Sequence, residues 1–334
     1  MKISVIGMGS IGQRHFQNLI SFKKKYNIKT ICGYEKNNSR VLKLKKKFNK
    51  FFITNNLKEA VLGSDVVYIC SPTNLHIESI KNVLKFSNPH FYIEKPLSYT
   101  IDNCKEILLK IKKRKKKVGM GYMLYNHPVI KFTKKLLNEN KLGKVLFARA
   151  ESGFYLPFWH PWEDYRDFYM SSLKQGGGAL LDTSHEINYL QYFFGEVESV
   201  SGKVQTISNL EITSDDLTLA NINFKNKVQA QIHLDLLQFD EERYFKIIGS
   251  KSVLIGDLKN NFVKVFNLKS KKWKIKKFSV NFDKIYHIQL DNFIRMIKNK
   301  SSTICKSDSA FHTMQIIDAI RKSSKKKSSL VRVK

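Results

Sequence analysis

Residues 1–12, written MKISVIGMGSIG, start with a short β-branched run and continue into the pattern Gly7-x-Gly9-x-x-Gly12. A helical pattern follows over residues 13–19. A strand, a glycine-rich turn and a helix in this order form the fingerprint of dinucleotide-binding folds. Gly7 permits a tight turn, Gly9 lets the backbone approach a pyrophosphate, and Gly12 allows close packing of helix on strand. The stretch therefore predicts a dinucleotide cradle.

The anion in such a cradle is bound by backbone amides at the start of the helix. Met8, Ser10 and Ile11 would supply these amides here. The next expected strand, residues 28–35, ends in Glu35, a little more than twenty residues beyond the last glycine. A carboxylate at this place holds the hydroxyls of the adenosine ribose, so the sequence favours NAD.

NADP stays open as the second cofactor. Lys36 and Arg40 follow Glu35 closely and could accommodate a 2′-phosphate. The general positive charge of the chain would also favour an anionic ligand.

Short apolar runs continue the alternation of strands with helix-length segments, at residues 51–53, 65–70, 90–93 and 117–121. This alternation predicts a doubly wound parallel sheet, and we expect the NAD(P)-binding domain to cover residues 1–122.

Ligands bind at the carboxyl ends of the strands in such sheets, so the loops that follow the strands are candidate cofactor contacts. Two loops stand out, the first after the run at 65–70 and the second after the run at 90–93. They supply Ser71, Pro72, Thr73, Asn74 and His76, and then Glu94, Lys95 and Pro96.

A second glycine-led stretch, residues 176–195, reads GGGALLDTSHEINYLQYFFG. We expect one helix here, in which Asp182 and His185 are three residues apart and share a face. A polar pair beside an apolar stripe suggests that the helix lines a pocket.

The chain resembles the Gfo/Idh/MocA family, the group of glucose-fructose oxidoreductase and inositol dehydrogenase. The glycine fingerprint, the Glu94-Lys95-Pro96 tripeptide and the Asp182/His185 stretch match in order and span most of the chain. The resemblance implies a catalytic trio of Lys95, Asp182 and His185. His185 would carry the proton with help from Asp182, whose spacing D-x-x-H is shorter than the D-x-x-x-H common in the family.

The assigned chemistry agrees with the residue types. A hydride leaves carbon while the hydroxyl proton passes to a base, and an imidazole with a pKa of about 6.5 suits that work. Lys95 would hydrogen-bond the reacting oxygen and stabilise its developing negative charge. All three residues would contact substrate, and Lys95 and Glu94 would also lie against the cofactor.

The resemblance also implies that residues 123–334 form an α/β domain for substrate binding and oligomerisation, with a large open, mostly antiparallel sheet. Its face would hold a homodimer or homotetramer together. Independently, the alternation at 228–236 predicts a strand, and further strands are expected at 244–255, 261–267 and 272–280. Helices at about 284–299 and 308–323 could pack back on the first domain, and the lysine-rich tail is expected to fray.

Substrate contacts are sought in an aromatic-dense loop, residues 154–169. Trp162 could stack on a sugar ring, and Arg166 could bind a carboxylate or phosphate in a bidentate manner. A small core under a long loop explains the aromatic residues equally well. Tyr122, from the loop at 121–128, is a further candidate.

The formal net charge of +31 suggests nucleic acid, but the basic residues are mostly Lys, whereas groove and phosphate recognition favours Arg. We therefore expect no specific nucleic-acid partner. No apolar run is long enough for a membrane span, no secretory signal is recognised, and four dispersed Cys suggest neither zinc nor disulfides. These features predict a cytoplasmic protein without a metal site.

The predicted function is an NAD(P)-dependent dehydrogenase or reductase acting on a CH–OH group of a sugar, sugar acid or nucleotide-sugar. A role in making surface polysaccharides or sialic-acid-like sugars is one interpretation. The alternative is a non-catalytic dinucleotide sensor or a nucleic-acid-associated protein. Reduction of an imine or a tetrapyrrole is a further possibility that the same fold can host.

Overall fold

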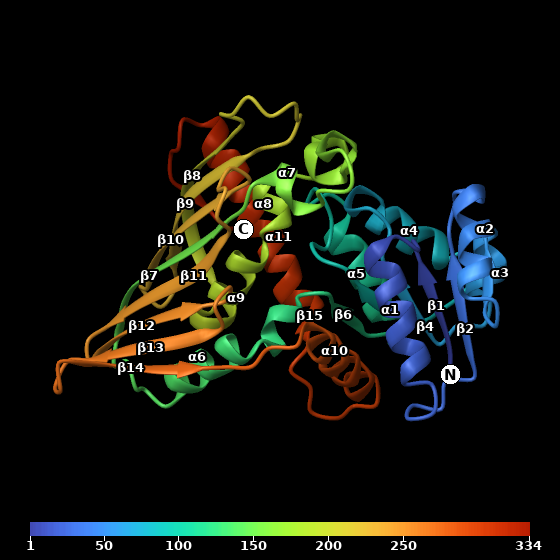
Figure 1. Cartoon of the computed structure of the whole chain (residues 1–334), viewed down its shortest axis with the longest axis horizontal. Helices are drawn as coiled ribbons and strands as arrows, with labels where there is room; N and C mark the ends of the chain where they lie inside the picture. The colour runs from blue at the N-terminus through green and yellow to red at the C-terminus, as the bar shows by residue number, and fades with distance from the viewer. The chain divides into compact units, whose positions relative to one another are not determined.

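The computed structural model describes all 334 residues and divides them into two compact units. The first unit comprises Met1–Met123 together with Phe282–Phe311, and the second comprises Leu124–Asn281 together with His312–Lys334. Each unit has its own sheet, and we describe the two separately (Figure 1).

The first unit contains a seven-stranded sheet in the order β15-β6-β5-β4-β1-β2-β3. Strands β1 to β6 pair in parallel, as predicted, and only β15 at the edge is antiparallel. The strands are β1 (Lys2–Ile6), β2 (Thr30–Tyr34), β3 (Phe52–Thr54), β4 (Val66–Ile69), β5 (His90–Ile93), β6 (Val118–Met120) and β15 (Cys305–Lys306).

Helices pack against this sheet and close its core. Helix α1 contacts α10, whereas α4 contacts both α3 and α5. Phe16 of α1, Tyr68 of β4 and Phe293 of α10 lie in one buried apolar cluster. The helices are α1 (Ser10–Ser21), α2 (Asn38–Lys47), α3 (Leu57–Val61), α4 (His76–Val83), α5 (Cys104–Lys113) and α10 (Phe282–Ile297).

The second unit contains a nine-stranded sheet in the order β14-β13-β12-β11-β7-β10-β9-β8-β16. Only β7 and β10 pair in parallel, so the predicted large, mostly antiparallel sheet is confirmed. The strands are β7 (Val145–Gly153), β8 (Val197–Gln205), β9 (Leu217–Phe224), β10 (Gln229–Asp235), β11 (Glu242–Gly249), β12 (Ser252–Asp257), β13 (Phe262–Asn267), β14 (Lys272–Lys277) and β16 (Val331–Arg332).

Helices cover one face of this sheet (Figure 1). On β10, Ala230, Ile232 and Leu234 are buried, while Gln229 and Gln231 between them are exposed. Successive side chains of a strand point to opposite faces of the sheet. The exposed glutamines therefore lie on the second face, which has no helical layer. The helices are α6 (Pro128–Asn138), α7 (Leu156–Trp159), α8 (Ala179–Asp182), α9 (His185–Phe194) and α11 (Ser307–Lys325).

The structure corrects the single helix predicted over residues 176–195. It shows two helices, of which α8 ends at Asp182 and α9 begins at His185. The Thr183 hydroxyl donates to the carbonyl of Ala179, and such back-bonding by a β-branched side chain weakens a continuing helix. Asp182 and His185 therefore stand at facing helix ends rather than on one face of one helix.

The lysine-rich tail is also ordered, contrary to our expectation of fraying. Val331 and Arg332 pair with β8 as strand β16, and the amide of Val333 donates to the carbonyl of Glu198. The Ser323 hydroxyl donates to the carbonyl of Ser329 and accepts from the amide of Gly202. These contacts with β8 order the tail. Sequence alone did not indicate them, because β8 is remote from the tail in the chain.

No helix combines the length and the apolar character needed to cross a bilayer. The four cysteines are all buried and unbridged, and no group of three or more His, Cys, Asp or Glu side chains is arranged to bind a metal ion.

Candidate functional site

The glycine turn after β1 has little room except at one position. Gly7 has a positive φ of 87°, and a Cβ there would lie 2.6 Å from the amide nitrogen of Ser71. A Cβ on Gly12 would lie 1.9 Å from the carbonyl oxygen of Gly7, so α1 packs directly on the turn. At Gly9 a Cβ would meet nothing within 4 Å. Gly9 therefore faces open space at the start of α1.

Helix α1 begins at Ser10 with no side-chain cap on its amides. Gly9 is its N-cap residue, and the amides of the first turn lack intrahelical partners, as in every helix. Uncapped amides beside open space fit the pyrophosphate of a dinucleotide, to which the helix dipole also contributes favourably.

Glu35, just beyond β2, is buried next to this turn. Its carboxylate accepts hydrogen bonds from the amides of Met8 at 3.2 Å and Asn37 at 3.1 Å. Arg40 lies 3.5 Å from the same carboxylate. The residue predicted to bind the ribose hydroxyls and a residue predicted to bind a 2′-phosphate therefore form one ion pair. Lys36 is exposed beside them.

The loop after β4 carries one buried polar atom without a partner, Oδ1 of Asn74. Ser71 hydrogen-bonds Ser79, Thr73 is buried, and Pro72 is exposed. An unsatisfied amide oxygen in a loop predicted to contact the cofactor is suited to accept a hydrogen bond from that ligand. With the open space at Gly9, it indicates that this unit can hold a dinucleotide.

The turn after β5 places Lys95 between two fixed neighbours. The Glu94 carboxylate accepts from the Lys95 amide at 3.2 Å and lies 2.7 Å from Nε2 of His15. The peptide bond between Lys95 and Pro96 is cis. His76 is buried, and both of its ring nitrogens already face backbone carbonyls, which gives this predicted cofactor residue an internal role.

In the second unit, Asp182 holds the glycine loop. Its carboxylate accepts from the Tyr169 hydroxyl at 2.7 Å and from the amide of Gly178 at 3.1 Å. Gly178 has a φ of 114°, and a Cβ there would lie 2.2 Å from a carboxylate oxygen of Asp215. Glycine is required at position 178 because Asp215 packs directly against its backbone.

His185 is 8% exposed at the start of α9. The next residue, Glu186, is fully buried and accepts a bidentate pair from Arg243 of β11, at 2.8 and 3.2 Å. This ion pair fixes the helix end that carries His185. Sequence reasoning missed Glu186 and Arg243, Tyr169 and Asp215 because their partners come from distant segments.

Two predicted substrate residues are engaged in other contacts. Arg166 pairs with Asp164 and Glu211, both at 2.6 Å, so its fork is already occupied by carboxylates. Trp162 is 73% exposed and stacks on His160 with ring centroids 4.9 Å apart. Tyr122, by contrast, is buried directly after β6. Of these three residues, only Trp162 presents a largely exposed aromatic ring.

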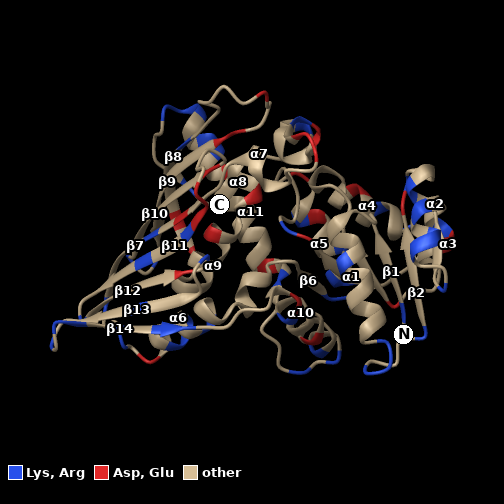
Figure 2. Ribbon diagram, viewed as in Figure 1, with Lys and Arg blue, Asp and Glu red and all other residues tan.

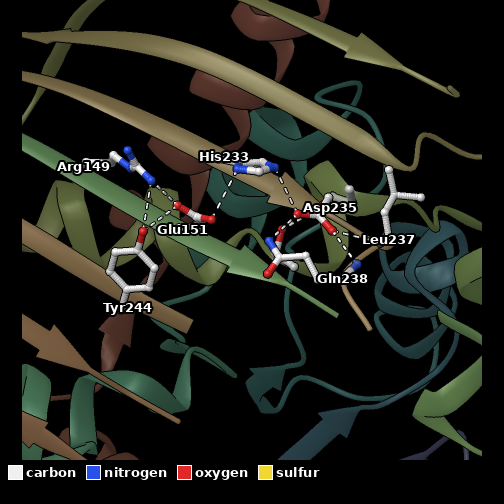
Figure 3. Close-up of polar contacts among 9 residues, drawn as sticks. Arg149, Glu151, His233, Asp235, Leu237, Gln238 and Tyr244 are labelled. Atoms are coloured by element: carbon white, nitrogen blue, oxygen red, sulfur yellow. Dashed lines mark hydrogen bonds and ion pairs between the residues drawn. The ribbon is translucent and has the colours of Figure 1, made fainter. Parts of the chain in front are cut away.

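The uncovered face of the second sheet carries a charged network (Figure 3). Its centre is His233, whose Nε2 lies 3.0 Å from Asp235 and whose Nδ1 lies 3.5 Å from Glu151. Glu151 also accepts from Arg149 at 2.6 Å and from the Tyr244 hydroxyl at 2.8 Å. Both carboxylates are buried, so their charges need these partners.

This network should make stability depend on pH. The hydrogen bond to Asp235 raises the pKa of His233. Burial acts to raise the pKa values of Glu151 and Asp235, but bonds from Arg149 and from His233 outweigh it, so both pKa values are lowered. The His233 contribution is therefore complete below about pH 6.5 and is lost as pH rises through the raised value. The carboxylate contributions are present above about pH 4 and are lost below it.

We expect His233→Gln to destabilise the protein more at pH 6 than at pH 9. A charge-assisted bond contributes on the order of 1.5–3 kcal/mol, and because the His233 side chain is 36% exposed we expect about the lower end of this range at pH 6. Urea unfolding of both proteins at the two pH values measures the difference. An equal loss at pH 6 and pH 9 would show that the charge of His233 does not matter.

Basic side chains are distributed over both units rather than gathered in one region (Figure 2). Lys45, Lys46 and Lys47, for example, lie in the last turn of α2, where cations complement the helix dipole. Ion pairs with Asp or Glu occupy further basic residues, such as Lys225 and Lys259.

A parallel-sheet unit with space for a dinucleotide, together with a second unit built on an open sheet, is typical of two-domain dehydrogenases. Residues 1–122 match the "Oxidoreductase family, NAD-binding Rossmann fold", and residues 134–333 match the "Oxidoreductase family, C-terminal alpha/beta domain". The chain belongs to the Gfo/Idh/MocA family of oxidoreductases, as the resemblance predicted.

Individual relatives are distant. The scyllo-inositol 2-dehydrogenase (NAD(+)) of Bacillus subtilis is 23% identical over 91% of this chain and 88% of its own. Levoglucosan dehydrogenase in complex with NADH and levoglucosan superposes with a TM-score of 0.85 at 18% identity, covering 100% of this chain and 99% of the other. The WlbA dehydrogenase of Bordetella pertussis, in complex with NADH and UDP-GlcNAcA, gives a TM-score of 0.82 at 15% identity over 100% and 98%. The structural likenesses concern the fold.

Proposed function

We propose that this oxidoreductase transfers hydride between a nicotinamide cofactor, preferably NAD, and a CH–OH group of a sugar, sugar acid or nucleotide-sugar. The observation that carries the proposal is the open space at Gly9 beside the uncapped amides of α1. The inositol dehydrogenase relative and the dehydrogenase structures with bound levoglucosan or UDP-GlcNAcA support the substrate class. Surface-polysaccharide or sialic-acid-like sugar biosynthesis is the pathway that we propose for it.

The assigned residues divide the chemistry. His185 takes the hydroxyl proton as general base, and Lys95 donates a hydrogen bond to the oxygen as negative charge develops there. Asp182 acts through structure, because its carboxylate holds Tyr169 and the amide of Gly178. When bound, the nicotinamide supplies the hydride acceptor.

The first test is thermal unfolding with NAD, NADH, NADP and NADPH at matched concentrations and physiological salt. A ligand that binds the folded state raises the midpoint according to its affinity. We expect the larger shift with NAD and NADH, since Glu35 is buried with its carboxylate fixed by two backbone amides. Absence of a shift with all four would contradict the cofactor site and favour the nucleic-acid alternative.

Oxidation assays follow with the preferred cofactor. We would use scyllo-inositol, levoglucosan and UDP-GlcNAcA as probes of the three substrate classes and follow NADH absorbance. Turnover of any probe would establish CH–OH chemistry. Cofactor binding without turnover of these or of a wider sugar panel would contradict the proposed substrate class.

The uncovered sheet face is the proposed interface of a homodimer or homotetramer. Five apolar side chains stand opposite one another across five strands, and Trp273 at the end of the row is 45% exposed. They are Phe147, Ile248, Val253, Phe266 and Trp273. A continuous apolar row on a bare sheet face is suited to burial against a second copy.

We expect Trp273→Glu to shift the protein from oligomer to monomer, because burying an unpaired carboxylate in the interface costs several kcal/mol. Light scattering after size-exclusion chromatography measures the mass. Leu42→Glu is the matched control, since Leu42 is 65% exposed on α2 and lies outside the row. A wild-type monomer, or an unchanged oligomer in the Trp273 variant, would contradict the interface.

We also propose that the protein works in the cytoplasm. The four buried, unbridged cysteines fit a reducing compartment, where thiols stay free.

A further inference from the structure

Two buried histidines hold the turn that carries Lys95, one on each side of it. His15 of α1 contacts Glu94, the residue before the lysine. His76, the first residue of α4, contacts the carbonyl of Pro96, the residue after it. All of these residues lie in the first unit.

The contact between His15 and Glu94 is close and shielded from water. Nε2 of His15 lies 2.7 Å from one carboxylate oxygen, and the two side chains are 6% and 11% exposed. The other oxygen accepts from the Lys95 amide at 3.2 Å. The Glu94 carboxylate thus links the helix of the dinucleotide cradle to the backbone of the lysine.

The side chains of His15 and Glu94 are closely packed by their neighbours. Tyr92 and Tyr286 meet the His15 ring edge to face, with centroids 5.0 and 5.7 Å away. A Cβ on Gly121 would lie 2.5 Å from a carboxylate oxygen of Glu94, so the strand end after β6 packs directly against it. In such a close-packed site the carboxylate cannot move without displacing its neighbours.

His76 connects the same turn to the loop after β4. Its Nδ1 lies 2.9 Å from the Pro96 carbonyl oxygen, and its Nε2 lies 2.9 Å from the Ser71 carbonyl oxygen. Burial lowers the pKa of His76, which favours the neutral ring with a single N–H. Because carbonyl oxygens only accept, that N–H donates to one of the two carbonyls, the choice depending on the tautomer. The imidazole thus lies between the two loops predicted to face the cofactor and can donate to either.

We propose that His15 and His76 are positioning residues that fix the backbone on both sides of Lys95 and so aim its ammonium group. This inference rests on the proposed role of Lys95. Lysine has a flexible four-carbon stem, so the place of its backbone decides where its charge can reach. A displacement of about 1 Å at a reacting group can cost about a hundredfold in rate.

The test compares His15→Leu with His15→Gln. Leucine removes the donor to Glu94, whereas glutamine retains an N–H that can reach it. We expect His15→Leu to lower kcat at least tenfold on the best probe sugar, with the Kd for NADH changed less than threefold. His15→Gln should recover part of the loss. His287→Leu is the matched control, because His287 belongs to the same unit and its ring contacts Asn18 and Phe22.

A second readout needs no substrate. The Lys95 amide donates to Glu94, so releasing that carboxylate should speed hydrogen exchange of this amide at least tenfold in the protein without ligand. The amides within β5 should exchange as before, because their partners lie in neighbouring strands. Unchanged exchange at Lys95 in His15→Leu would overturn the proposal.

Should His15→Leu not fold, His76→Leu repeats the kcat and NADH measurements on the other side of the turn, because leucine has no donor for the Pro96 carbonyl. Lys95→Met distinguishes the role of the lysine from the role of the two histidines. Full activity in Lys95→Met would overturn the proposed role of the lysine itself. Loss of activity in Lys95→Met together with full activity in both histidine variants would overturn only the positioning role.

Discussion

Lys95→Met is expected to lower kcat by about a thousandfold on the best sugar while NADH binding stays within about threefold of the wild type. Removing one donor to a developing oxyanion costs about 10²–10³ in rate. Methionine keeps most of the volume of the side chain and removes the charge. Steady-state kinetics with NADH absorbance measures the loss, and fluorescence titration measures NADH affinity.

The thermal midpoint is the control for this variant. Lys95 lies in a turn whose Glu94 carboxylate is held by His15, so the fold should survive the loss of the ammonium group. A variant with a normal midpoint and normal turnover would show that the lysine does not contact the reacting oxygen. Loss of NADH affinity instead of kcat would assign Lys95 to the cofactor.

The parts of the fold predicted from the sequence are those set by neighbouring residues. The cradle at Gly7, Gly9 and Gly12 follows from a local pattern, and the parallel sheet follows from the alternation of strands and helices. The tail strand at Val331 and Arg332 was missed, because a two-residue strand depends on the edge of β8, which is remote in sequence.

The same division applies to the candidate site. The pattern around Gly178 and Asp182 was recognised from the sequence, but the carboxylate partners, Tyr169 and the amide of Gly178, depend on a folded loop. His15 follows Gly12 by three residues and could have been noticed as a polar side chain beside the buried Phe16. Nothing local indicated that its partner would be Glu94, seventy-nine residues further on.

Arg166 shows what residue type alone leaves out, namely the partners that the side chain already has. An arginine in an aromatic loop is well suited to bind a substrate carboxylate. Here Asp164 and Glu211 already occupy its fork. Sequence alone could not show this, because Glu211 lies in a segment forty-five residues away. Arg166 ties the aromatic loop to that segment, and a substrate carboxylate would have to compete with these two partners.

Gly9→Val is expected to remove dinucleotide binding and to leave the fold intact. A Cβ at this position meets no protein atom within 4 Å, so the added side chain would extend into the space assigned to the pyrophosphate. We expect NADH affinity to fall at least a hundredfold in fluorescence titration. Valine is a poorer N-cap residue than glycine, so the free energy of unfolding should drop by only about 1 kcal/mol.

Gly12→Ala is the contrasting variant in the same turn. Its Cβ would lie 1.9 Å from the Gly7 carbonyl oxygen, and a backbone atom cannot rotate away as a flexible side chain can. Overpacking of this kind costs 1–3 kcal/mol or more, so Gly12→Ala should lower the unfolding midpoint as well as NADH affinity. If Gly9→Val instead binds NADH normally, the open space at the start of α1 is not the cofactor site. Gly12 would then serve packing alone, and the cofactor site would have to be sought elsewhere.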